Sequence, residues 1–154
     1  MATPSGRATG RLAQALPLLG LIAAIWALLP PYSGPDLATE MRVEIADHVV
    51  PSILLVALSL ASLIRARRLG SPLGSGTFML LAGLGILLAG FWMVATHLPL
   101  VAQARRGDVP GGTAAYHTAP GLAVMVLGLV WTVLHWNDAA PESQRPARPG
   151  SPGG

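Results

Sequence analysis

Three histidines, His48, His97 and His117, stand at the ends of three separate apolar stretches of this 154-residue chain. Imidazole nitrogen is a good ligand for zinc, copper, iron and nickel, and a carboxylate can complete such a shell. Glu44 precedes His48 by four residues, which is one helical turn. We therefore take these three histidines and Glu44 as candidate metal ligands.

Two neighbouring residues could support the site. Asp47 is a candidate acceptor for an imidazole N–H, the kind of contact that orients metal-bound histidines, and Tyr116 adds a hydroxyl beside His117. The cofactor would be a transition metal or, alternatively, haem b held between two of the three histidines. A quinol or proton-relay site is a further alternative, because histidine titrates near neutral pH. The histidines can also be purely structural, since interhelical hydrogen bonds to histidine are common packing contacts in membranes.

The elements that carry these residues look like membrane spans. Hydrophobic residues make up 52% of the chain and charged residues only 11%, against about 25% charged in soluble domains. Four stretches contain no Asp, Glu, Lys or Arg: residues 12–29, 49–64, 77–96 and 118–134. A transmembrane helix needs about 20 apolar residues. The sequence predicts an all-α integral membrane four-helix bundle with spans at 12–30, 46–64, 77–97 and 117–136.

The arginines predict the orientation of the bundle. Seven lie on one side of the predicted spans: Arg7, Arg11, Arg65, Arg67, Arg68, Arg145 and Arg148. Arg42, Arg105 and Arg106 lie on the other side. By the positive-inside rule, both termini are then cytoplasmic, and we expect the plasma (inner) membrane. Arg65, Arg67 and Arg68 act as the topology signal with anionic lipid contact as a second role, so we expect the lipid bilayer and no nucleic acid as a partner.

The remaining segments are assigned by composition. Residues 1–11 and 137–154 have little apolar content to bury, and we expect them to be disordered cytoplasmic tails. Residues 105–112 read as a flexible outer loop. Apolar residues recur every four positions after Pro35, which predicts an outer amphipathic helix that leads into the second span, with Pro51 kinking the join.

Helical periodicity indicates that the histidines point inward. At 100° per residue, Gly90 lies about 20° from His97, and Gly128 lies about 20° from the face of His117. Small residues repeated on one face mark close contacts between membrane helices. On the second span, His48 shares a stripe with Ser52 and Ser59. The three histidines are therefore expected to converge at the outer boundary of the membrane.

No catalytic motif accompanies this cluster, and we expect a non-enzymatic protein. The leading interpretation is an accessory or assembly subunit whose polar outer end contacts other membrane subunits or a second copy of the chain. The alternative is a metal- or haem-binding protein for redox chemistry or metal handling. A transporter or channel subunit that acts as an oligomer is the third. All-arginine basic residues with heavy Ala, Gly and Pro usage are typical of bacteria with GC-rich genomes.

Overall fold

The computed structural model describes residues 4–28, 45–68 and 76–136, with side chains at 15–28, 45–65 and 76–136. In these ranges the chain is helical except for a short turn at residues 107–110. The elements are α1 (Pro4–Leu28), the π-helix η1 (Ile45–Val49), α3 (Val50–Arg68), α4 (Gly76–Arg106) and α5 (Gly111–Trp136). Since η1 runs directly into α3, the described part contains four long helices. Glu44, the rest of the predicted amphipathic helix and the C-terminal tail lie outside the described residues.

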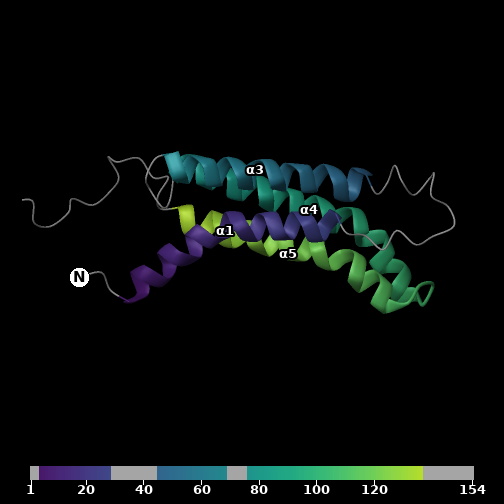
Figure 1. Cartoon of the computed structure of the whole chain (residues 1–154). Helices are drawn as coiled ribbons and strands as arrows, with labels where there is room; N and C mark the ends of the chain where they lie inside the picture. Colours follow the sequence, from purple (N-terminus) through teal and green to yellow (C-terminus); the bar gives the residue numbers. More distant parts are fainter. Residues whose placement is uncertain (1–3, 29–44, 69–75, 137–154) are drawn as a thin grey trace, which may run out of the picture.

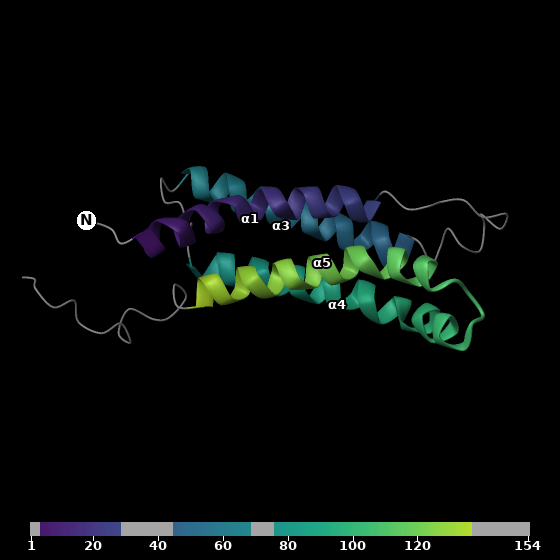
Figure 2. The same cartoon turned by 90° about the horizontal axis from the view of Figure 1, so that it is seen from below.

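The four helices lie side by side in two pairs. Figure 2 shows α1 beside α3 and α4 beside α5, and contacts also join α3 to α4 and α1 to α5. In Figure 1, the hairpin of α4 and α5 continues past the ends of α1 and α3. Each of the two hairpin helices carries an internal proline, Pro99 or Pro120, that removes a backbone hydrogen bond and permits a bend.

Three of these helices are long and apolar enough to cross a membrane: Ile45–Arg65, Gly76–Arg106 and Gly111–Trp136. In α1, the apolar stretch with described side chains is the shorter Ala15–Leu28. The predicted first span, 12–30, extends beyond that stretch at both ends. The first span therefore stays a prediction.

The outward faces differ from those of a water-soluble protein, and some polar side chains are buried. Ser52, Ser59 and Ser62 on α3 are completely buried. The outward faces instead carry large apolar side chains: Ile22, Ile25, Val50, Ile53, Leu81, Leu88, Phe91, Val126, Leu129 and Val133. In hydrocarbon, polar side chains face the protein interior and apolar ones face lipid. This pattern fits a protein whose outer surface is solvated by lipid.

Glycines hold α4 and α5 close together. A Cβ atom at Gly90 would collide with the backbone of Met125, and one at Gly128 would collide with the backbone of Leu87. Hydrogen is the only substituent that fits at these two positions, because the opposing atoms belong to a helix backbone and cannot rotate away. The prediction that these glycine faces form a helix contact is confirmed.

The ends of the helices differ from the sequence-based prediction. The segment 105–112 was expected to be a loop, but α4 continues to Arg106 and α5 begins at Gly111. The connection is tight, with Gly107 at a φ of 83° and its N–H donating to the carbonyl of Ala104 at 3.1 Å. Residues 4–11, placed in a disordered tail, form the first part of α1. A hydropathy pattern predicts only the part of a helix that crosses lipid. It does not predict polar extensions of the helix beyond that part.

Because α4 and α5 approach closely, we predict that one added methyl group at their contact lowers the stability of the protein. We expect Gly90→Ala to lower the free energy of unfolding by about 1–3 kcal/mol, because the added methyl forces the two backbones apart. The measurement is reversible unfolding in mixed detergent micelles, followed by circular dichroism. Gly112→Ala is the matched control, since nothing lies within 4 Å of its Cβ position. A Gly90→Ala protein as stable as the control would contradict the packing.

Candidate metal centre

The antiparallel register of α4 and α5 brings two histidines together. A Cβ at Gly83 would lie 2.8 Å from the backbone nitrogen of Thr132, and Gly90 faces Met125. A step of seven residues along α4 is therefore matched by seven residues back along α5. One further step places His97 opposite residue 118, next to His117. The two imidazoles are stacked, with ring centroids 6.1 Å apart and planes inclined by 27°.

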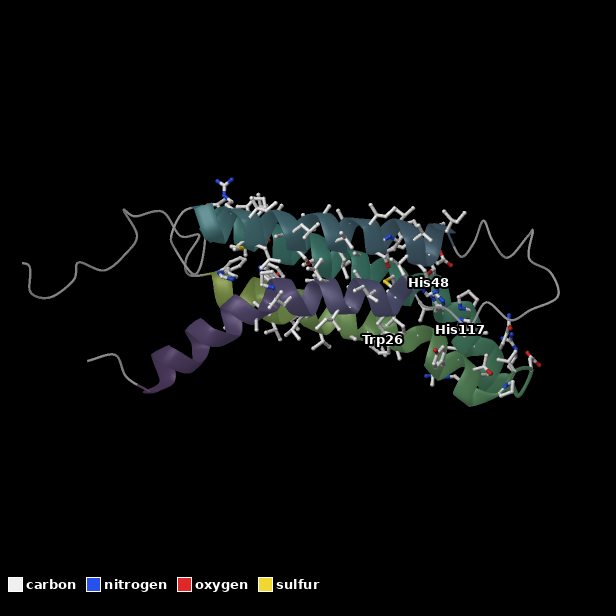
Figure 3. All side chains as sticks on the ribbon, in the orientation of Figure 1. Trp26, His48 and His117 are labelled. Carbon is white, nitrogen blue, oxygen red and sulfur yellow. The ribbon has the colours of Figure 1, made fainter. Side chains whose placement is uncertain are left out.

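The third histidine comes from η1. His48 is buried, with 3% of its surface exposed. Its ring meets that of His97 edge to face at a centroid distance of 4.9 Å, and the two Nε2 atoms are 3.2 Å apart. One ligand nitrogen from each of His48, His97 and His117 lies within 4.8 Å of the other two. In Figure 3, His48 and His117 lie at the end of the molecule where the α4–α5 hairpin turns.

The backbone around His48 departs from α-helical geometry. Residues 45–49 form one π-helical turn that ends two residues before Pro51, which has no N–H to donate. Such a turn holds one more residue than an α-helical turn, so it changes the direction of the side chains within it. Counting at 100° per residue assumes a regular α-helix and cannot account for the extra residue, although it placed His48 on the inward face.

Hydrogen bonding orients the ring of His97. Its Nδ1 lies 2.7 Å from the carbonyl oxygen of Met93, which can only accept, so Nδ1 carries the proton. The hydroxyl of Thr96 donates to the same carbonyl at 3.1 Å. In the neutral ring, Nε2 then presents a lone pair toward His48. Metal-bound histidines commonly have this arrangement, in which the second ring nitrogen donates to a backbone carbonyl or carboxylate.

The distances suit a single metal ion better than a haem. Two ligands at about 2.0–2.1 Å from a tetrahedral zinc ion are about 3.3 Å apart, close to the 3.2 Å between the Nε2 atoms of His48 and His97. The nitrogen of His117 would have to approach by at most about 1.5 Å to join them, since it already lies within 4.8 Å of the other two. A haem held between His48 and His97 would need its porphyrin plane between their ligand nitrogens, and the direct contact of these two rings leaves no room for it.

The supporting residues named from the sequence have different positions. Asp47 is half-buried in the same turn as His48, and Tyr116 is exposed with its ring edge-on to His117 at 6.2 Å. Glu44 lies outside the described residues. The roles of these three in the site stay predictions.

The arginine group lies at the far end of α3. The guanidinium of Arg65 stands 5.0 Å from the ring centroid of Phe78, a cation–π contact that joins α3 to α4. Arg67 and Arg68 belong to the last turn of α3, and their side chains lie outside the described residues. Their topological and lipid-binding roles stay predictions.

The histidine cluster lies about one membrane thickness from the opposite helix ends. At 1.5 Å per residue, about 32 Å of α4 separates Gly76 from His97, and about 29 Å of α5 separates Trp136 from His117. A hydrocarbon core is about 30 Å thick. If the opposite ends lie at one surface of a bilayer, the histidines lie at the other.

Two partners of the cluster were missed by sequence reasoning. The Met93 carbonyl was not considered as an acceptor, although a histidine can reach the carbonyl four residues before it in a helix. The indole of Trp92 was not considered as a donor. Its ring is half-exposed, but its indole Nε1 also donates to the carbonyl of Ala46 in η1 at 3.3 Å. No periodicity rule could reveal that contact, because it depends on the π-helical turn.

Comparison with known proteins identifies no relative: no protein-family model, no curated protein and no solved structure matches this chain.

The hydrogen bond to Met93 predicts the tautomer of His97. We expect His97 in the metal-free protein to be protonated at Nδ1 and not at Nε2 when its ring is neutral. Nitrogen-15 NMR of protein labelled at its four histidines measures this directly, because protonated and unprotonated ring nitrogens have well separated shifts. The His97→Gln variant assigns the signal. An Nε2–H tautomer at His97 would contradict the proposed ring orientation.

Proposed function

We propose that this chain is a small multi-pass membrane protein that binds one transition-metal ion through His48, His97 and His117. The observation that carries the proposal is the convergence of three imidazoles from three helices, with ligand nitrogens within 4.8 Å of one another. The hydrogen bond from His97 to Met93 supports it, because it leaves a lone pair on the nitrogen that faces the cluster. The sequence alone favoured an accessory or assembly subunit, and the geometry of the three histidines favours metal handling instead.

The donor set indicates the class of metal. Three neutral nitrogen ligands suit zinc, copper, nickel or cobalt, whereas magnesium and calcium prefer oxygen. Three imidazoles leave room for at least one more ligand in a tetrahedral shell, and Glu44 or a water molecule could supply it. When bound, the ion would provide Lewis acidity or, if copper, one-electron redox chemistry. The protein's own contribution is to hold three ligands at fixed positions on helices.

We further propose that the four helices form a transmembrane bundle in the plasma membrane with both termini cytoplasmic. The three apolar helices and the apolar outward faces support a membrane location, and the distribution of arginine supports the orientation. In this topology the histidine cluster lies at the outer boundary of the bilayer. It would exchange metal with the space outside the cytoplasm.

Metal content of the purified protein tests the proposed function. We expect the full chain, purified in mild detergent and dialysed against zinc, to retain close to one ion per chain by elemental analysis. The variant His48→Gln/His97→Gln/His117→Gln should retain at least tenfold less, because glutamine preserves size but offers no imidazole.

His135→Gln is the control for this experiment. His135 is also buried and lies on α5, but at the opposite end from the cluster. This variant should bind zinc like the original chain. If the unsubstituted chain is folded and free of metal, the cluster is not a metal site. Co-purification with a larger membrane complex would then favour the accessory-subunit alternative.

Reporter fusions test the orientation. A fluorescent protein fused after Gly154 should fluoresce in a bacterial host, because this end is expected in the cytoplasm. Alkaline phosphatase inserted at Val109, in the turn between α4 and α5, should be active, because it folds only outside the cytoplasm. The opposite pair of results would show that the topology is inverted and that the histidine cluster lies at the cytoplasmic face.

A further inference from the structure

The turn that carries His48 is attached to α4 at two points. One is the contact between His48 and His97, whose Nε2 atoms are 3.2 Å apart. The other is the hydrogen bond from the Trp92 indole to the Ala46 carbonyl, at 3.3 Å. On α4, Trp92 and His97 are five residues apart. On η1, Ala46 and His48 are two residues apart. Any rotation or slide of η1 along α4 would therefore disturb both contacts together.

The hydrogen bond from Trp92 replaces a backbone hydrogen bond that Pro51 cannot make. In a π-helical turn each carbonyl pairs with the N–H five residues later. The carbonyl of Ala46 would thus face the nitrogen of residue 51, which is proline and has no hydrogen to donate. A backbone carbonyl without a donor is costly near hydrocarbon. The indole N–H of Trp92 supplies that donor from the neighbouring helix.

We propose that Trp92 is a positioning residue for the metal centre, which it serves by holding the π-helical turn that aims His48 at His97. This inference rests on the proposed function for its effect on metal binding, but the hydrogen bond acts on the turn with or without metal. Trp92 does not touch the ion. Trp92 is 55% exposed, whereas His48 is buried, so the indole contacts the turn on the outward face of the bundle.

Replacing Trp92 with phenylalanine tests the proposal, because the ring is kept and the N–H is removed. We expect Trp92→Phe to bind Co(II) about tenfold more weakly than the unsubstituted chain, as loss of an outer-shell contact does at other metal sites. The cobalt absorption bands should also change, since His48 would be less well placed to ligate. The full chain in lipid nanodiscs is titrated with Co(II), and affinity and spectrum are read together.

Trp136→Phe is the matched control. Trp136 is an exposed tryptophan at the last position of α5, at the opposite end from the histidine cluster. This variant should keep the affinity and the spectrum of the unsubstituted chain. Equal affinity and an identical spectrum for Trp92→Phe would overturn the positioning role while leaving the metal site intact.

A measurement without metal separates this inference from the proposed function. If the unsubstituted chain binds no cobalt, metal binding fails, but Trp92 can still be tested through histidine NMR of the metal-free protein. Trp92→Phe should then shift the ring signals of His48 and His97 and leave that of His135 unchanged. Ring signals that do not move in Trp92→Phe would overturn the proposal whatever the metal result.

Discussion

The close approach of α4 and α5 is the constraint on which the rest of the structure depends. Lipid supplies no hydrophobic drive between helices, so their association relies on close packing. Gly90 and Gly128 allow each backbone to touch the other. This contact fixes the register of the hairpin, and the register puts His97 beside His117. Larger residues at the glycines would separate the two imidazoles as well as the two helices.

The second determinant is local and lies in the backbone of η1. Pro51 prevents a regular α-helical hydrogen bond at the start of α3, and the chain passes through a π-helical turn instead. The turn gives His48 its direction, and Trp92 supplies a donor to one of its carbonyls. The candidate site therefore combines a rigid hairpin with a turn attached to it from a third helix. Precision at such a site comes from both parts.

The sequence predicts some of these features well and others not at all. Long uncharged stretches indicate the helices, and the spacing of Gly83, Gly90 and His97 indicates their contact face, because these depend on composition and simple periodicity. The π-helical turn and the Trp92 contact escape prediction because they depend on neighbours distant in sequence. The continuation of α4 to Arg106 escapes it for another reason. Polar helix outside lipid has no hydropathy signal that separates it from a loop.

The order of the elements along the chain has a consequence for biosynthesis. The ribosome delivers His48 first, and the α4–α5 hairpin that carries the other two histidines follows. Neither part alone offers all three imidazoles of the cluster, so under the proposed function a chain still being inserted would hold metal weakly. Capture of an ion would begin only when the last helix has folded back along its neighbours. Metal retention would thereby distinguish molecules with all of these helices in place from molecules that lack one of them.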